Sequence, residues 1–155
     1  MSRIIGLWFA SVMYICAFIK YASEEDGNLH EGNINQAIAY EVSQNGRVLR
    51  QNIHIGMNID AASRPSMDGI IAYVGGWKRG EFNLRFGQPS KDVCYIMPEL
   101  FPFTDTRQKD SIAGKQGGLL DRMIDQENVP KIMFTNSSAE DWRGDAAFIL
   151  SSIHI

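Results

Sequence analysis

The 155-residue chain has little of the chemistry that metal, redox and nucleic-acid proteins use. It holds three histidines and two cysteines, and no two of them stand at the close spacing of a transition-metal site. Fifteen lysines and arginines are outnumbered by eighteen aspartates and glutamates, so no basic surface for nucleic acid is expected. Two cysteines make no disulfide framework and indicate no particular redox compartment. We expect no metal, no cofactor and no nucleic-acid partner.

Charge is also missing from one long apolar run, from Ile4 to Ile19, which stands between Arg3 and Lys20. A basic start before an apolar core is typical of a signal peptide or a short anchor. The run is, however, shorter than the roughly 20 residues that span a bilayer. The other interpretation is a helix inside a layered α/β domain, apolar on nearly all sides because it is covered on nearly all sides. No small-residue cleavage site follows the run, which favours the buried helix and argues against a membrane partner.

After this run, strand-like and helix-like segments alternate. Short strands are predicted at Ala37–Val42, Gly69–Val74 and Lys131–Thr135. Helices are predicted at Asn45–Met57, Gly118–Gln126 and Ala139–Leu150. Strands separated by helices indicate a parallel sheet with right-handed crossovers, here in one α/β domain over residues 1–155. Residues 77–117 are too long for a simple connection and are predicted to form a long loop or a lid-like excursion.

Three parallel strands make a small sheet. Parallel sheets need both faces covered, and their edge strands need protection from other chains. The strand count therefore predicts part of a larger α/β domain, or self-association, or a partner that covers the exposed edges of the sheet.

Ser43 stands where the first predicted strand turns into the first helix after it, and Gln44-Asn45-Gly46-Arg47 follow. This order matches a nucleophile elbow, the sharp turn that lifts a serine hydroxyl above a parallel sheet. The alternative is that Ser43 caps the helix. A serine hydroxyl is a poor nucleophile unless a neighbouring base takes its proton, and no histidine stands in an obvious place to do so.

The run from Ser43 to Arg50 resembles the G-x-S-Q-S-G-R-x-L-R motif of a bacterial group of α/β-hydrolase domain proteins. Three later stretches are similar to the same group: RGEFNLRFGQPS (79–90), LFPFTD (100–105) and PKIMFTNSSAEDW (130–142). The resemblance covers most of the chain. It implies a partial α/β-hydrolase sheet of about three parallel strands with crossover helices, lacking the first strands and the last. The strands with the early oxyanion loop would precede Met1, and the loop with the family's catalytic histidine would follow Ile155.

The resemblance implies an esterase-like serine hydrolase that acts on a small-molecule carboxylic ester. It assigns Ser43 as the nucleophile, the Gln44 amide as an oxyanion donor and Glu140 as the acid that orients a histidine. Glu140 has a second interpretation, as a first-turn carboxylate that the helix dipole favours. Two departures from the family weaken the resemblance: Glu41 replaces a glycine of the motif, and Asp141 replaces an aromatic residue.

Two further predictions concern the base and the substrate. His154 is the candidate base of this chain, although it lies at the end of the sequence, where residues are seldom held firmly. A polar cluster in the long loop either binds a carboxylate or pins the loop through backbone hydrogen bonds. Its members are Arg79, Asn83, Arg85 and Gln88. The sequence thus leaves two functions open, an impaired or incomplete serine hydrolase and a non-catalytic fragment or pseudoenzyme that depends on a partner.

Overall fold

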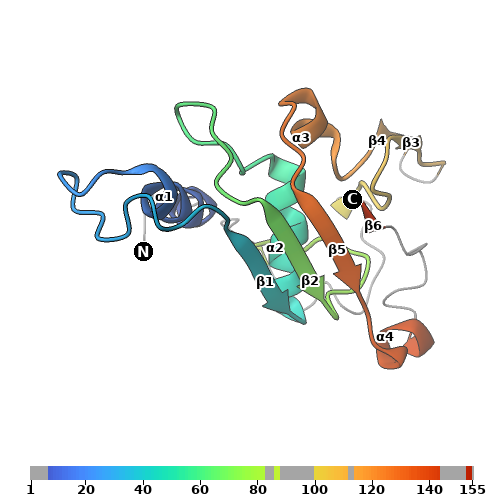
Figure 1. The fold of residues 1–155 in the computed structure, drawn as a ribbon. Coiled ribbons are helices and arrows are strands. Elements are labelled where there is room, and N and C mark those ends of the chain that lie inside the picture. The colour runs from blue at the N-terminus through green and yellow to red at the C-terminus, as the bar shows by residue number, and fades with distance from the viewer. Residues whose placement is uncertain (1–6, 83–85, 88–99, 112–113, 144–152, 155) are drawn as a thin grey trace.

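The computed structural model describes the chain except for residues 1–6, 83–85, 88–99, 112–113, 144–152 and 155. Its centre is a parallel sheet of β1 (Ile38–Val42), β2 (Gly69–Tyr73) and β5 (Lys131–Thr135), as Figure 1 shows. The two-residue strand β6 (Ile153–His154) pairs antiparallel with β5, which gives the order β1-β2-β5-β6. The prediction of three parallel strands in a partial α/β fold is confirmed, whereas β6 was not predicted.

The three parallel strands are in level register. Ile38 pairs with Gly69, which pairs with Lys131, and four residues later Val42, Tyr73 and Thr135 form the last row. Because parallel strands point the same way, their carboxyl ends meet at one edge of the sheet. The turn at Ser43 lies at this edge.

Helix α2 (Gln44–Ile55) covers one face of the sheet. It lies behind the strands in Figure 1 and packs with α3 (Asp121–Asp125). Apolar side chains of the two helices, of the turn before α3 and of the strands form one core: Leu49, Ile53, Ile70, Ala72, Leu119, Leu120, Met123, Ile132 and Phe134. Helix α2 ends at Gly56, whose φ of 71° lets its amide bond back to the carbonyls of the last turn.

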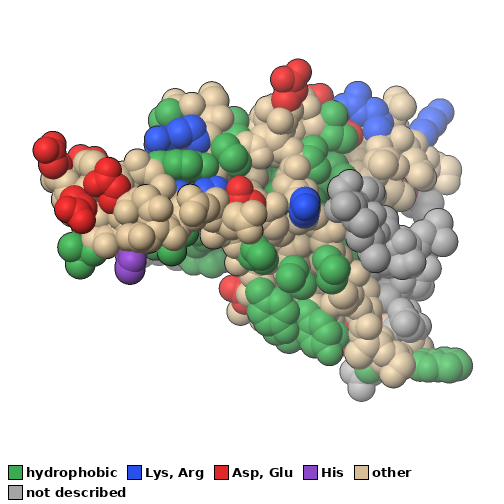
Figure 2. Space-filling model, in the orientation of Figure 1, with side chains coloured by type: hydrophobic (Ala, Val, Ile, Leu, Met, Phe, Trp, Pro, Cys, Tyr) green, Lys and Arg blue, Asp and Glu red, His purple; other side chains and the backbone are tan. Residues whose placement is uncertain are grey.

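The other face of the sheet is not covered by any described helix. Side chains alternate along a strand, so every second residue of β1 points away from α2. The exposed apolar side chains on this face are Ile38, Tyr40, Val42, Tyr73 and Met133. Figure 2 shows hydrophobic side chains gathered over the lower ends of the strands. Most parallel sheets are covered on both faces, and the described part of this chain covers one.

Helix α1 (Leu7–Tyr21) lies beside the edge strand β1 (Figure 1). It buries one side, formed by Phe9, Met13, Ala17 and Lys20. The opposite side exposes Leu7, Trp8, Val12, Tyr14, Ile15 and Phe18. The expectation of a helix covered on nearly all sides is therefore wrong for the described residues, because α1 lies beside the sheet and not between two layers. None of the described helices has both the length and the apolar character needed to cross a membrane.

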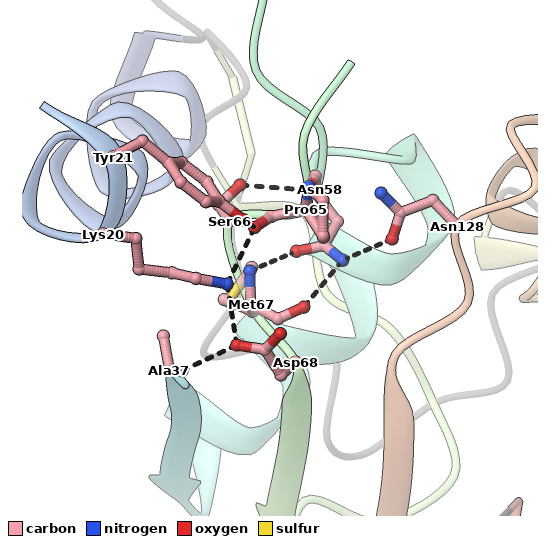
Figure 3. Close-up of polar contacts among 9 residues, drawn as sticks. All are labelled: Lys20, Tyr21, Ala37, Asn58, Pro65, Ser66, Met67, Asp68 and Asn128. Carbon is pink, nitrogen blue, oxygen red and sulfur yellow. Dashed lines mark hydrogen bonds and ion pairs between the residues drawn. The ribbon is translucent and has the colours of Figure 1, made fainter. Parts of the chain in front are cut away.

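The last turn of α1 is attached to the amino end of the sheet by polar contacts (Figure 3). Lys20 Nζ donates to Asp68 Oδ2 at 2.8 Å and to the Pro65 carbonyl at 3.0 Å. The Tyr21 hydroxyl donates to the same carbonyl at 2.7 Å. Asp68 also accepts from the Ala37 amide at 2.8 Å, so one carboxylate joins α1, the start of β1 and the start of β2.

Asn58 holds the adjoining loop together in the same view (Figure 3). Its side chain donates to the Met67 carbonyl at 3.0 Å and to Asn128 Oδ1 at 3.0 Å, and accepts from the Met67 amide at 2.9 Å. The Ser66 hydroxyl donates to the Asn58 carbonyl at 3.0 Å. Asn58 and Ser66 are fully buried; their bonds with each other and with Met67 close the connection between α2 and β2, and the bond to Asn128 ties it to the loop before β5.

The two remaining segments follow their predictions in part. The described part of residues 77–117 is irregular apart from a hairpin of β3 (Gln108–Lys109) and β4 (Gln116–Gly117). Helix α4 runs over Ser138–Arg143, where a helix from Ala139 to Leu150 was predicted. The predicted residues from 144 onward lie outside the described part of the chain.

Candidate functional site

Ser43 occupies a strained turn between β1 and α2. Its φ of 58° and ψ of −124° lie in a region of backbone space that is essentially reserved for glycine, at a cost of about 1–3 kcal/mol. The residue is the N-cap of α2, yet its side chain makes no capping hydrogen bond and is exposed. Its amide donates to the Tyr73 carbonyl at 2.8 Å, which ties the turn to the end of β2. The side-chain cap considered for Ser43 is therefore not what the structure contains.

A contact between two glycines lets α2 start directly above the end of β2. A Cβ placed on Gly46 would lie 3.1 Å from the Cα of Gly75, and one placed on Gly75 would lie 3.1 Å from the carbonyl carbon of Gly46. The neighbouring Val74 also has a positive φ, of 47°, which is rare for a β-branched residue. Sequence reasoning missed this contact, although a glycine inside a predicted helix and another after a predicted strand were its signal.

The ends of β2 and β5 are bonded to each other at the same edge. The Val74 amide donates to the Thr135 carbonyl at 2.7 Å, and the Gly76 amide donates to Asn136 Oδ1 at 3.0 Å. The Thr135 hydroxyl is buried and has no hydrogen-bond partner among the described residues. An unpartnered buried hydroxyl is costly, and it lies here in the same row of the sheet as the residue before Ser43.

Gln44, the predicted oxyanion donor, is the first residue of α2. The amides of the first helical turn have no intrahelical carbonyl to bond, so the Gln44 amide belongs to the set that is available to a ligand. The positive end of a twelve-residue helix adds to the attraction of negative charge at this point.

Glu140 takes part in the N-terminal cap of α4. Its Oε2 accepts from the Ser137 amide at 2.9 Å and from the Ser137 hydroxyl. The Ser137 hydroxyl oxygen in turn accepts from the Ala139 amide at 3.2 Å. This Ser-x-x-Glu arrangement is a capping box, which corresponds to the helix-carboxylate interpretation of Glu140.

The described structure brings no histidine to Ser43. The backbone of His154 pairs with Ile132, three strands across from β1 and several residues below the carboxyl edge, which places it about 20 Å from Ser43. His54 lies eleven residues along α2, about 16 Å up the helix axis. Burial, and then the charges of Arg79 and Arg122, lower the pKa of His54 to about 4. His30 is exposed in the loop beyond α1.

Of the predicted substrate-binding cluster, the structure describes Arg79, whereas Asn83, Arg85 and Gln88 lie outside the described residues. Arg79 is buried, donates to Gln51 Oε1 at 2.6 Å and also donates to the Phe101 carbonyl. These contacts correspond to the interpretation in which the arginine pins the long loop. Burial, and then the nearby charge of Arg50, lower the pKa of Arg79 to about 10, so the guanidinium stays charged at neutral pH.

Glu41 lines a cavity of about 220 Å³ between α1, β1 and α2, together with mostly apolar side chains such as Trp8 and Phe9. The Glu41 side chain therefore lies on the face of β1 that α2 covers, and Ser43 does not line this cavity.

Within the described residues, no three histidine, cysteine, aspartate or glutamate side chains gather as a metal site would need. Models of known protein families, curated proteins and solved structures were compared with the chain, and none matched.

Proposed function

We propose that Ser43 is the nucleophile of an esterase-like serine hydrolase, in a form whose catalytic machinery is incomplete in this chain. The observation that supports this most is the backbone of Ser43, because the turn holds a residue with a side chain where glycine would be strain-free. Strain of this kind is retained where it has a use, and presenting a hydroxyl above the carboxyl edge of a parallel sheet is such a use.

The proposed reaction is acyl transfer from a carboxylic ester. Ser43 Oγ forms a bond to the acyl carbon, its proton passes to solvent water, and the ester C–O bond breaks to release the alcohol, which takes a proton from solvent. Water then attacks the acyl-enzyme and releases the acid. The Gln44 amide and the start of α2 stabilise the negative charge that develops on the carbonyl oxygen.

Among the described residues, no histidine lies close enough to Ser43 to act as the base. His54 is neutral at pH 7 but lies too far along α2, and the backbone of His154 lies on the opposite edge of the sheet. We therefore expect a slow reaction with activated substrates and little turnover of ordinary esters, because loss of the base leaves the nucleophile turn and the oxyanion donor to act alone.

Labelling with a fluorophosphonate probe tests the proposal. We expect slow, stoichiometric labelling that Ser43→Ala abolishes. Ser63→Ala is the matched control, because Ser63 is also an exposed serine with a positive φ, of 59°, but lies in a loop and not before a helix. Labelling that survives Ser43→Ala, or that Ser63→Ala removes, would contradict the proposal.

The second function, a non-catalytic partner-binding protein, is favoured by the apolar face of the sheet that no described helix covers. Glu41, which replaces a glycine of the motif, also favours it. A folded sample in which Ser43 reacts no faster than Ser63 would support this function over the first.

A further inference from the structure

Two buried arginines lie close together between α2 and the described parts of the long loop, residues 77–117. The exposed fraction is 2% for Arg50, which stands in α2, and 6% for Arg79, which stands in the loop. Arg79 donates to the side chain of Gln51, the residue after Arg50, and also to the Phe101 carbonyl. Asp105, a little further along the same loop, pairs with Arg50. Two guanidinium groups are therefore held near each other in the interior.

The positive charge of this pair exceeds the negative charge beside it. Within the described residues, Asp105 supplies the carboxylate that pairs with Arg50, and no acidic side chain pairs with Arg79. Asp105 Oδ1 lies 3.6 Å from Arg50 Nη2, which is longer than a hydrogen bond. Burial lowers the pKa of each arginine to about 10, and for Arg79 the charge of Arg50 adds to this effect. Both guanidinium groups are therefore still charged at neutral pH, against one carboxylate.

The same two side chains hold hydrogen-bond donors that are not used. Arg79 pins the loop through Nη1 and Nη2, which leaves its Nε. This Nε and the Nε and Nη1 of Arg50 are buried and have no hydrogen-bond partner among the described residues. The ring of Phe134, whose centre lies 4.2 Å from the Arg50 guanidinium carbon, attracts the charge but does not neutralise it. Buried polar atoms are almost always bonded, and a water molecule would accept from these donors without balancing the charge. An anion does both.

We propose that Arg50 and Arg79 bind the carboxylate of a small organic acid, which accepts from their unbonded nitrogens and balances their excess charge. A carboxylate has one negative charge, which equals the excess, whereas a phosphate group has about 1.5 to 2 at neutral pH. The planar guanidinium also matches the planar carboxylate in shape. Arg50 lies about 10 Å along α2 from Ser43, so this site is separate from the Ser43 hydroxyl and independent of the reaction proposed there.

Thermal unfolding of the full chain in sodium formate, the smallest carboxylate, tests the proposal. We expect Tm to rise with formate concentration, because formate binds the folded state, and not to rise in sodium chloride of the same ionic strength. Arg50→Met should raise the dissociation constant for formate about tenfold or more, because it removes charged donors. Arg64→Met is the matched control and should leave this constant unchanged, because Arg64 is 47% exposed in the loop before β2.

A second measurement needs no substitution and so does not depend on the folding of a variant. In the nitrogen-15-labelled chain, the Nε–H signals of Arg50 and Arg79 in the NMR spectrum should shift as formate is added, whereas that of Arg64 should not. Signals of Arg50 and Arg79 that do not move would overturn the proposal. So would an equal effect of chloride, or a response to formate that Arg50→Met leaves unchanged. Binding of inorganic phosphate without binding of formate would also overturn it, because the site would then select a phosphate group.

Discussion

The two ends of the parallel sheet differ in how fully their polar side chains are hydrogen-bonded. At the amino end, Asn58 uses both ends of its side-chain amide, and Asp68 accepts from Lys20 and from the Ala37 amide (Figure 3). At the carboxyl end, the Ser43 side chain makes no capping hydrogen bond, and the buried Thr135 hydroxyl has no partner within the residues that the structure describes. The polar groups at the amino end therefore stabilise the fold, whereas those at the carboxyl end contribute less than they could.

This difference indicates where a ligand belongs. Buried polar groups are almost always bonded, so an exception needs a reason other than folding. In open α/β sheets, ligands bind outside the carboxyl ends of the strands. The Thr135 hydroxyl, which is buried without a partner in the described part of the chain, lies at that end, whereas Asn58 and Asp68 at the amino end bond to groups of the chain itself.

The largest expected effect is at Asn58. Asn58→Ala removes the partners of the Met67 amide and carbonyl in the interior, where water cannot replace them, and should lower the free energy of unfolding by about 3 kcal/mol. Urea unfolding at constant m-value measures this. Asn45→Ala, at an exposed position in the first turn of α2, is the control and should cost less than about 0.5 kcal/mol. Equal losses of unfolding free energy in Asn58→Ala and Asn45→Ala would contradict the difference between the amino and carboxyl ends of the sheet.

The ion pair of Lys20 with Asp68 comes next. The Lys20 side chain is 3% exposed and that of Asp68 is 34% exposed, so Lys20→Met should cost about 2 kcal/mol, less than for a fully buried pair. Arg107→Met is the control, because Arg107 is 58% exposed in its pair with Asp121 and should cost less than about 0.5 kcal/mol. Thermal unfolding of both variants at pH 7 measures the two losses of stability. Equal losses would contradict a special role for the pair of Lys20 with Asp68.

The same pair predicts a dependence on pH. Burial alone raises the pKa of Asp68, but the hydrogen bonds from Lys20 and from the Ala37 amide outweigh it and hold the pKa below its ordinary value. The folded state therefore binds the proton more weakly than the unfolded chain does. The stabilisation is present above the ordinary aspartate pKa and is lost as pH falls through the lower, folded value. In Lys20→Met, the free energy of unfolding should fall less steeply as the pH is lowered, as urea unfolding over a range of acidic pH values would measure. An unchanged slope would show that other carboxylates cause the pH dependence.

Local patterns were enough to predict the three parallel strands of the sheet. Alternating strand formers between turn residues gave β1, β2 and β5 close to their observed bounds, because a strand and its flanking turns are specified within a few residues. The exposed side of α1 could not be predicted in this way. Ile4 to Ile19 is apolar at every angle around a helix, so the sequence carries no period that tells the covered side from the open one.

The turn at Ser43 was predictable in position but not in backbone geometry. The order of strand, Ser43 and helix located the turn, yet the backbone angles depend on the contact between Gly46 and Gly75, which are far apart in the sequence. The pairing of His154 with Ile132 was also hidden, because a two-residue strand has too few residues to show a period. Contacts across the fold, and not local preference, decide both features.

A smaller effect of opposite sign is expected at Ser43. Ser43→Gly relieves the strained φ and should raise the free energy of unfolding by about 1 kcal/mol, after the greater flexibility of glycine in the unfolded chain is subtracted. Ser43→Ala keeps the strain and loses no cap, so it should be close to neutral. Ser137→Ala removes a hydroxyl that does cap a helix and should cost about 1 kcal/mol. A loss of stability in Ser43→Gly would show that the turn is not strained.

The smallest effect sharpens the comparison to a single hydroxyl at each end. Thr135→Val replaces an unpartnered buried hydroxyl by a methyl group of nearly the same shape, and should raise the free energy of unfolding by about 0.5 kcal/mol. Ser66→Ala removes a fully buried hydroxyl that donates to the Asn58 carbonyl, and should lower it by about 1 kcal/mol. Chemical unfolding of the two variants side by side measures the difference. If Thr135→Val also destabilises the fold, the Thr135 hydroxyl has a partner such as a bound water, and the carboxyl end is not the less satisfied of the two.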